Sequence, residues 1–196
     1  MSAQISLVAA GLALAIWIYL IAARGDFWRT QKFDDLEPVP AVEHWPSIAV
    51  VVPARDEALG VAANVTSILS QPYPGTLSMI LVDDQSQDGT SQIASGAAIA
   101  IGASDRLTVL QGRPLPSGWT GKLWAVKQGL TLVEGWSVQP DYVLLTDADI
   151  VYSGDLLMRL VARAQRDRLA MTSVMAMLRC ESFAEKYLIP AFIFFF

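Results

Sequence analysis

The sequence contains one cysteine, Cys180, and one histidine, His44, among its 196 residues. A single cysteine excludes an internal disulfide framework and a cysteine zinc site, and a single histidine excludes a multi-histidine metal centre. Charged residues are also scarce, at 17% of the chain, against about 25% in typical soluble domains. The 14 lysines and arginines face 19 acidic residues, and the resulting net charge of −5 argues against nucleic-acid binding.

Two phosphate-binding signatures are missing as well. The sequence has no G-x-G-x-x-G fingerprint, and the segment from Gly118 to Lys122 is not a P-loop because Leu123 replaces the required hydroxyl residue. A flexible turn with Lys122 at a helix start can still hold a pyrophosphate or a polar acceptor. The alternative interpretation of that segment is a loop with a solvated lysine.

Apolar residues are abundant, at 53% of the chain, and they are concentrated at the N-terminus. Ile5–Ala23 has no charge, and as a helix it reaches roughly 28 Å, close to the thickness of a bilayer's hydrocarbon core. A cleaved signal peptide and a buried core helix are the alternatives. Because Arg24, Arg29 and Lys32 follow the run and no charged side chain precedes it, we expect one uncleaved transmembrane helix in the cytoplasmic (inner) membrane, with the remaining chain in the cytoplasm.

Composition divides the chain into four predicted segments. Residues 1–23 form the anchor, and residues 24–46, rich in acidic residues and proline, form a juxtamembrane linker. Residues 47–182 form the folded domain. Residues 183–196 are the start of an apolar, membrane-associated segment that we expect to be truncated.

Within the folded domain, apolar runs alternate with segments of helical periodicity. The expected strands cover residues 48–52, 78–82, 107–110, 142–145 and 169–177. The expected helices cover 57–71, 88–101 and 122–133, with a fourth capped by Asp155. The first of these helices places Leu59, Ala62, Val65, Ile68 and Leu69 on one face. This alternation predicts an α/β fold, a mostly parallel sheet with helices on both faces.

Three predicted strands end in polar or acidic clusters: Arg55-Asp56-Glu57, Asp83-Asp84 and Asp147-Ala148-Asp149. Ligands bind at the carboxyl ends of parallel strands, so these carboxylates are expected to gather at one edge. Their mutual repulsion requires a cation or hydrogen-bond donors.

The spacing of the acids suggests separate roles. Asp147 and Asp149 can share Mg²⁺ or Mn²⁺ that bridges to nucleotide phosphates, although an acidic turn is an equal alternative. Asp83 and Asp84 can accept hydrogen bonds from ribose hydroxyls or a base N–H. Asp88 and Gly89 require nothing more than an Asx-turn followed by a helix cap.

These pieces in this order resemble the family 2 glycosyltransferases of GT-A fold, which is Rossmann-like. The matching segments are Val51–Glu57, Val82–Thr90, Gly121-Lys122 with Ala125 and Gly129-Leu130, and Asp147–Asp149. The stretch from Pro114 to Lys122 and the closing Ile189–Phe196 resemble the membrane-anchored, hopanoid-associated (hopene-associated) glycosyltransferases.

The resemblance implies inverting transfer of a sugar from a nucleotide-sugar donor, a UDP-sugar, to a lipid acceptor such as a hopanoid at the membrane. It implies Mg²⁺ or Mn²⁺ held by Asp149 and Asp147. The implied nucleotide-sugar-binding residues are Pro53, Arg55, Glu57, Asp83, Asp84, Lys122 and Asp147.

The family's general base is expected beyond Phe196, so we interpret the chain as the N-terminal half of a longer enzyme or the product of an interrupted gene. The alternative is a catalytically incomplete, membrane-tethered nucleotide-binding fragment. A nucleotidyltransferase is less favoured because no glycine-rich loop follows the first strand.

Overall fold

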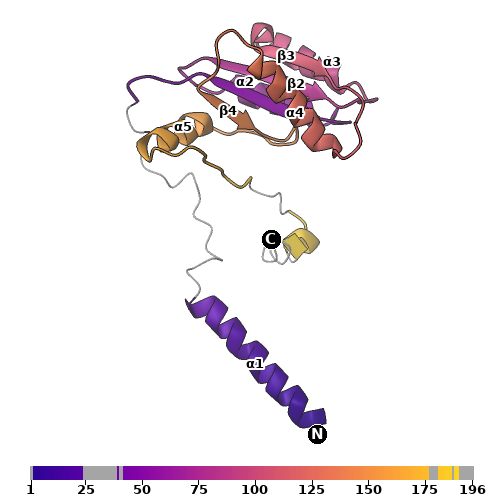
Figure 1. The fold of residues 1–196 in the computed structure, drawn as a ribbon, viewed down its shortest axis with the longest axis vertical. Helices are drawn as coiled ribbons and strands as arrows, with labels where there is room; N and C mark the ends of the chain where they lie inside the picture. Colours follow the sequence, from indigo (N-terminus) through magenta and orange to yellow (C-terminus); the bar gives the residue numbers. More distant parts are fainter. Residues whose placement is uncertain (1, 24–38, 40–41, 177–180, 187, 190–196) are drawn as a thin grey trace. The chain divides into compact units, whose positions relative to one another are not determined.

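The computed structural model describes residues 2–23, 39, 42–176, 181–186 and 188–189. Contacts divide the chain into two compact units, one of residues 39–173 and one of residues 1–38 with 174–196 (Figure 1). Most of the predicted linker, residues 24–38 and 40–41, lies outside the described residues, as do residues 187 and 190–196 of the predicted apolar end segment.

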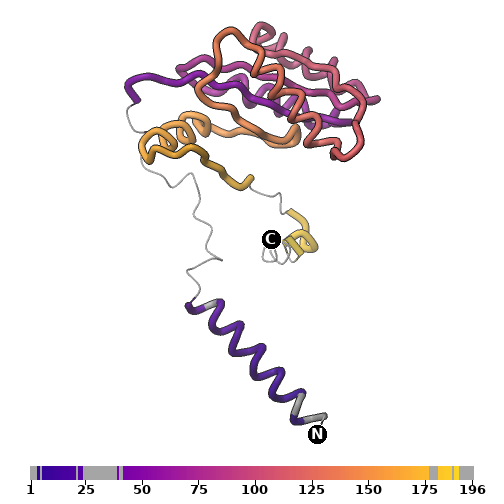
Figure 2. Tube along the Cα trace, viewed as in Figure 1, coloured from indigo at the N-terminus to yellow at the C-terminus, as the bar shows by residue number. Residues whose placement is uncertain are grey.

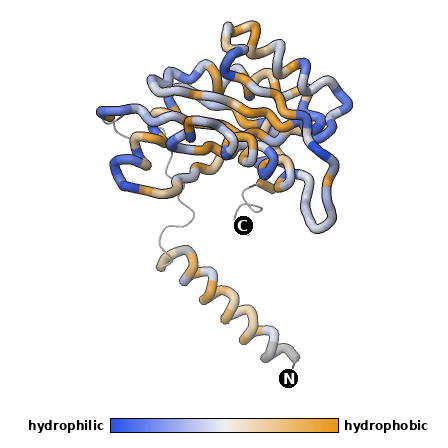
Figure 3. The backbone as a smooth tube through the Cα atoms, turned by 45° about the horizontal axis from the view of Figure 1, so that its top comes forward, coloured by the Kyte–Doolittle hydropathy of each residue, from blue (hydrophilic) through white to orange (hydrophobic). Residues whose placement is uncertain are grey.

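The unit that contains the N-terminus includes one long helix, α1 (Ser2–Ala23). Apolar residues occur along the whole of α1 and are not confined to one stripe (Figure 3). Leu7 is 76% exposed and Trp17 is 44% exposed. Among the helices of the described residues, none meets the length and hydropathy that a membrane crossing requires. The transmembrane role of Ile5–Ala23 stays a prediction.

The larger unit is built on a parallel sheet with the strand order β3-β2-β1-β4 (Figures 1 and 2). Its strands are β1 (Ile48–Ala54), β2 (Leu77–Asp83), β3 (Leu107–Gln111) and β4 (Tyr142–Leu145). The helices are α2 (Val61–Leu69), α3 (Thr90–Ala100), α4 (Gly121–Glu134) and α5 (Leu156–Arg166), with a short 3-10 turn, η2 (Ser104–Arg106). The predicted α/β architecture is confirmed.

The chain winds in two directions from β1. The β1-α2-β2-α3-β3 path runs toward one edge, and α4 then returns across the sheet to place β4 on the other side of β1. Because such crossovers are right-handed, the reversal places α4 on the opposite face of the sheet from α2 and α3. The sheet is therefore covered on both faces.

Both faces of the two central strands are buried, as expected for parallel strands. On the α4 face, Ala49, Val51, Ile80 and Val82 pack with side chains of α4. A Cβ added to Gly129 of α4 would lie 2.4 Å from Val51 Cγ1, so this helix approaches the sheet more closely than any side chain would allow. The opposite face carries an equally buried set: Val50, Val52, Met79 and Leu81.

Three local expectations were wrong. α2 begins at Val61 instead of residue 57, and residues 58–60 form a turn in which the N–H groups of Gly60 and Val61 both bond to the Glu57 carbonyl. Leu59 lies in that turn and is fully exposed, so it does not belong to the apolar face of α2. Residues 169–176 form no strand, and their backbone finds no sheet partner among the described residues.

Of the expected helix caps, Asp88 accepts the N–H of Thr90, the first residue of α3, at 3.0 Å, although Gly89 occupies the N-cap position. Asp155 occupies the N-cap position of α5 but makes no side-chain capping bond. The Asp155 carboxylate instead pairs with Arg159 at 2.7 Å, one turn into the helix.

Candidate functional site

Three loops leave the carboxyl ends of adjacent strands and lie together at one edge of the sheet. They comprise residues 55–60 after β1, 84–89 after β2 and 146–153 after β4. β1 lies between β2 and β4, so its loop adjoins both others. The three acidic clusters therefore lie at the edge where the sequence predicted them, with half-buried Pro53 near the end of β1.

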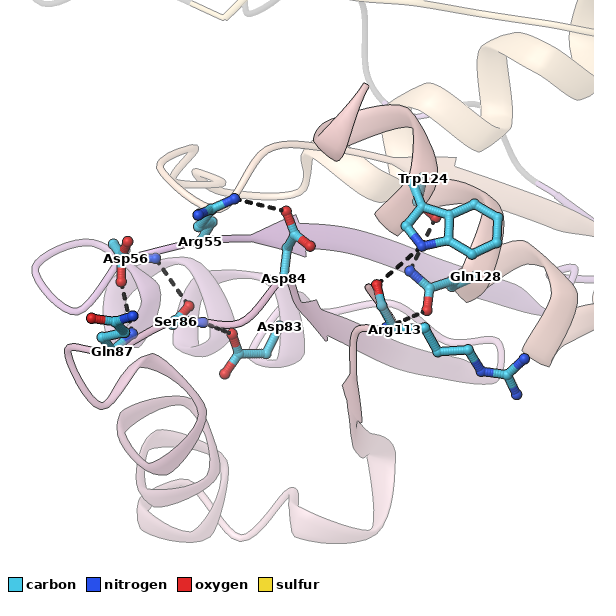
Figure 4. A network of polar contacts seen from close by, with 9 residues as sticks. All are labelled: Arg55, Asp56, Asp83, Asp84, Ser86, Gln87, Arg113, Trp124 and Gln128. Carbon is cyan, nitrogen blue, oxygen red and sulfur yellow. Dashed lines mark hydrogen bonds and ion pairs between the residues drawn. The ribbon is translucent and has the colours of Figure 1, made fainter. Parts of the chain in front are cut away.

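The loops after β1 and β2 are tied together by hydrogen bonds that run in both directions (Figure 4). The N–H groups of Asp56, Glu57 and Ala58 donate to side-chain oxygens of Ser86 at 2.9 Å, Thr90 at 2.9 Å and Asp88 at 2.8 Å. In return, the Gln87 N–H donates to Asp56 Oδ1 at 2.8 Å. These bonds hold Asp56 and Gln85 in left-handed backbone conformations, with φ of 54° and 63°.

Asp83 stabilises the loop after β2 from the interior of the protein. It is only 4% exposed, and its Oδ1 accepts the Ser86 N–H at 2.8 Å while its Oδ2 accepts the Ser91 hydroxyl. Burial alone would raise the pKa of Asp83, but the hydrogen bonds from Ser86 and Ser91 outweigh it and lower the pKa below its ordinary value. Both carboxylate oxygens are thus occupied within the protein.

Asp84 has a different environment. It is 7% exposed, and its Oδ2 lies 3.5 Å from Arg55 Nη1, whose side chain is 66% exposed (Figure 4). The same oxygen would lie 3.1 Å from a Cβ at Gly121, the first residue of α4. The Asp84 carboxylate therefore faces the positive end of the α4 dipole as well as a guanidinium. It keeps acceptor capacity toward the edge of the sheet.

The start of α4 also reaches the third loop. Lys122 Nζ lies 2.7 Å from Asp147 Oδ1, and both side chains are more than half exposed. At the other side of the helix, Trp124 Nε1 donates to the Arg113 carbonyl at 3.1 Å, and the Arg113 N–H donates to Gln128 (Figure 4). α4 is thereby fixed between the loops that follow β3 and β4.

Glu57 lies within reach of the acids of the β4 loop. Burial raises the pKa of Glu57, and the negative charges of Asp149, Asp88 and Asp147 raise it further. Asp147 and Asp149 are exposed while Ala148 between them is buried, so the two carboxylates stand on the solvent side of the loop. Glu57, Asp147 and Asp149 form one negative region.

The carboxylates at this edge suit a metal ion that binds together with a substrate. No cluster of three or more acidic, histidine or cysteine side chains with metal-holding geometry occurs among the described residues. Magnesium-like ions commonly use one or two carboxylates together with substrate phosphates. The exposed pair Asp147 and Asp149 fits that pattern, whereas a metal held by protein side chains alone does not fit.

Sequence reasoning missed the residues that hold the β4 loop in place. Asn64, on α2, is fully buried, and its Nδ2 donates to the carbonyls of Asp147 at 3.0 Å and Ile150 at 2.7 Å. The available signal was a polar side chain within the buried face of an amphipathic helix. Such a residue must find hydrogen-bond partners inside the protein.

A separate open cavity of about 740 Å³ lies at the amino ends of the strands, away from these acids. It is lined by His44, Pro46, Asp141, Tyr142, Val143, Gln165, Leu169 and Ala170. None of the predicted site residues reaches it. This cavity and the charged groups therefore lie at different ends of the sheet, and the convergence of charged groups favours the carboxyl end as the functional site.

The model of glycosyl transferase family 2 matches residues 49–192, which is most of the chain. The chain belongs to glycosyl transferase family 2. The family and the enzyme class predicted from the sequence are thereby confirmed. No curated protein matches this sequence.

Solved structures of similar fold include glycosyltransferases. A mannosyltransferase from Pyrobaculum calidifontis, PcManGT, solved with GDP-Man and Mn²⁺, is 25% identical with a TM-score of 0.54, and the match covers 82% of this chain and 42% of that one. TarS residues 1–349 from S. aureus, solved with UDP, is 26% identical with a TM-score of 0.47, and the match covers 62% of this chain and 33% of that one. This chain thus spans less than half the length of either protein.

Proposed function

We propose that this chain binds a nucleotide-sugar donor and transfers its sugar, with inversion, to a lipid acceptor at the membrane. The observation that carries the proposal is the convergence of Asp84, Lys122 and Asp147 around the first turn of α4. One side of this edge offers a carboxylate for a nucleoside, and the other offers an exposed acidic pair for a metal and diphosphate.

In this proposal, different residues at this edge bind different parts of the nucleotide-sugar donor. Asp84 accepts hydrogen bonds from the nucleoside, within a cradle formed by Pro53, Arg55 and Glu57. The ammonium of Lys122 and the free N–H groups at the start of α4 face the diphosphate. Asp149 and Asp147 would hold Mg²⁺ or Mn²⁺, which when bound supplies positive charge to the departing diphosphate. The Mn²⁺ and GDP-Man of PcManGT support this choice of ligands.

The acceptor and the membrane location rest on other support. The membrane location is supported by the sequence of α1 (Ser2–Ala23), which is helical and carries no charged side chain. A lipid acceptor, and a hopanoid in particular, follows from the resemblance of Pro114–Lys122 and Ile189–Phe196 to the hopanoid-associated enzymes. A UDP-sugar is the donor we expect, with GDP as the comparison nucleotide.

Because the chain spans 42% of PcManGT, nucleotide binding without turnover is the second candidate function. Turnover separates the two candidates. Release of sugar from a UDP-sugar, or its transfer to a lipid extract, by the full chain supports an enzyme. Metal-dependent UDP binding with neither reaction supports a binding fragment.

The donor site is tested by calorimetric titration of UDP into the full chain, with Mn²⁺ and with chelator. Asp84→Asn should weaken binding about tenfold to a hundredfold in both conditions, since it removes a charged acceptor. Asp149→Asn should weaken binding only when Mn²⁺ is present. Asp105→Asn, an exposed acid of η2, is the matched control and should bind as wild type does.

Each result bears on a different residue. Wild-type binding that ignores Mn²⁺ contradicts the metal role of Asp147 and Asp149. Unchanged binding by Asp84→Asn contradicts the nucleoside role of Asp84. If neither UDP nor GDP binds the folded wild-type chain, the proposed function is wrong.

A further inference from the structure

A polar stripe on α2 contacts the chain segment that follows β4. Asn64, Ser67 and Gln71 are spaced three and four residues apart, so they share one side of the helix and its C-terminal extension. Each makes a hydrogen bond to the backbone between Asp147 and Leu157. This segment has no regular structure before α5 begins at Leu156, so its shape depends on such bonds.

Asn64 makes the closest contact with the acidic loop. Its Nδ2 donates to two carbonyls, Asp147 O and Ile150 O, which lie on either side of Ala148 and Asp149. Within the turn, the Ile150 N–H bonds to the Asp147 carbonyl at 3.4 Å. An amide nitrogen carries two hydrogens, so one side chain can hold both ends of this turn. A serine or threonine hydroxyl has one hydrogen and could hold only one end.

Ser67 and Gln71 extend the contact toward α5. Ser67 Oγ accepts the Tyr152 N–H at 3.0 Å and donates to the Asn64 carbonyl at 2.9 Å. Gln71 Oε1 accepts the Leu157 N–H at 3.3 Å. At the other end, Gly60 lies against the backbone of Ala148 and Asp149, with a built Cβ 3.7 Å from each. The loop is therefore held along the length of α2.

The complete burial of the polar Asn64 side chain is energetically unfavourable. Its side chain is fully buried, and Oδ1 has no hydrogen-bond partner among the described residues. The two partners of Nδ2 are carbonyl oxygens, which can only accept hydrogen bonds. The side-chain nitrogen must therefore face the loop, and Oδ1 cannot take its place. Burying an unpaired acceptor is unfavourable, and an apolar residue would avoid it.

We infer that Asn64 is a positioning residue for the metal-binding carboxylates, which fixes the backbone between Asp147 and Ile150 so that Asp147 and Asp149 can act on one ion. This inference rests on the proposed function, because it assigns the loop's rigidity to metal binding. Two carboxylates bind one ion well only when their backbones are held in place before the ion arrives. Asn64 does not touch the ligand and acts through the loop.

The test compares three full-length chains: wild type, Asn64→Ala and Ile68→Val. Ile68 is a fully buried apolar residue of the same helix, so the control weakens the packing of α2 and leaves the loop bonds intact. Hydrogen exchange of the amides between Ala148 and Tyr152 should quicken about tenfold in Asn64→Ala and stay unchanged in the control. Exchange in β2 should be equal in Asn64→Ala and wild type.

Nucleotide titration supplies the second measurement. UDP binding with Mn²⁺ should weaken about tenfold in Asn64→Ala, while binding with chelator should be unchanged, because Arg55 and Asp84 lie on the loops after β1 and β2, outside the loop that Asn64 holds. A general loss of structure would weaken both. Equal loop exchange in folded Asn64→Ala and wild type overturns the inference, and so does equal loss of binding with and without metal.

Two further outcomes keep the tests separate. If wild type shows no metal-dependent binding, the metal role of Asp147 and Asp149 fails and the positioning role fails with it, whereas the exchange data still decide whether Asn64 holds the loop. If Asn64→Ala does not fold, Ser67→Ala removes the acceptor of the Tyr152 N–H in a smaller change. If hydrogen exchange at the Tyr152 amide is unchanged in that variant, the polar stripe does not hold the loop and the inference is wrong.

Discussion

Asp83 and Asp84 are adjacent in sequence but differ in what their oxygens contact. The backbone of β2 turns them to opposite sides, as successive residues of an extended strand do. Asp83 accepts bonds from Ser86 and Ser91 inside the loop, whereas Asp84 faces Arg55 and the first turn of α4. Asp83 therefore stabilises the loop, whereas Asp84 keeps acceptor capacity at the edge of the sheet.

This difference predicts the effect of pH on stability through Asp83. Its pKa in the folded protein lies below the ordinary value of 3.8, so the folded state favours the charged form. The stabilisation is present above the unfolded pKa and is lost as the pH falls through the folded pKa. Asp83→Asn should lower the free energy of unfolding at neutral pH by about 1.5–3 kcal/mol, since an amide cannot accept from both serines.

Urea unfolding at several pH values checks this prediction. Wild type should lose stability between about pH 5 and pH 2, and Asp83→Asn should lose less over the same range. Asp105→Asn should follow the wild-type curve. Parallel pH curves for wild type and Asp83→Asn would show that Asp83 does not carry this stabilisation.

The sequence alone could not separate these two acids. It placed Asp83, Asp84, Asp147 and Asp149 at strand ends, because strand ends follow from hydrophobic patterning. Which carboxylate turns inward depends on Ser86 and Ser91, and on where α4 begins, and these are tertiary contacts. Asn64 escaped notice for the same reason, since its partners lie more than 80 residues away.

At the scale of elements, α4 depends on the absence of a side chain at Gly129. A Cβ there would lie 2.4 Å from Val51 Cγ1 and 3.1 Å from Val82 Cγ2, both in the centre of the sheet. Gly129→Ala should lower the free energy of unfolding by about 1–3 kcal/mol through overpacking. The start of α4 would move with it, so the Lys122–Asp147 ion pair should also be disturbed.

Gly96→Ala is the control for that prediction. Gly96 lies in α3 with no atom within 4 Å of a built Cβ, so alanine should raise the free energy of unfolding by about 0.5–1 kcal/mol. Denaturant unfolding of both variants gives the two values. Effects of the same sign would mean that helix propensity, and not close packing, determines the response at Gly129.

The boundaries of helices and strands agree with the sequence prediction where the pattern of buried residues alone determines them. β4 was predicted at residues 142–145 and has those limits, and α4 differs from its expected range by one residue at each end. α2 starts late, after a turn over residues 58–60, where the N–H groups of Glu57 and Ala58 bond to the side chains of Thr90 and Asp88. Apolar periodicity carries no information about those tertiary contacts.

At the scale of the whole molecule, the chain combines a charge-free helix with an acidic α/β domain. The basic residues Arg24, Arg29 and Lys32 follow Ile5–Ala23, which predicts that the domain faces the cytoplasm. Protease added to sealed, inverted membrane vesicles should therefore digest the domain. Right-side-out vesicles should protect it, and the reverse pattern would contradict the orientation.

The strand order has a consequence for how the chain folds. β1 pairs with β2, and β2 pairs with β3, so each of these pairs joins strands that are consecutive in sequence. β4 instead pairs with β1 across more than 90 residues, as the hydrogen bond between Ser47 and Asp141 shows. Closing so long a loop costs more entropy than closing the earlier ones, so β4 is expected to join last. Asp147 and Asp149 arrive with that strand. The acidic edge is therefore expected to be completed only in the final step of assembly, and a chain that stalls earlier would have a formed core without the pair of carboxylates proposed to bind the metal.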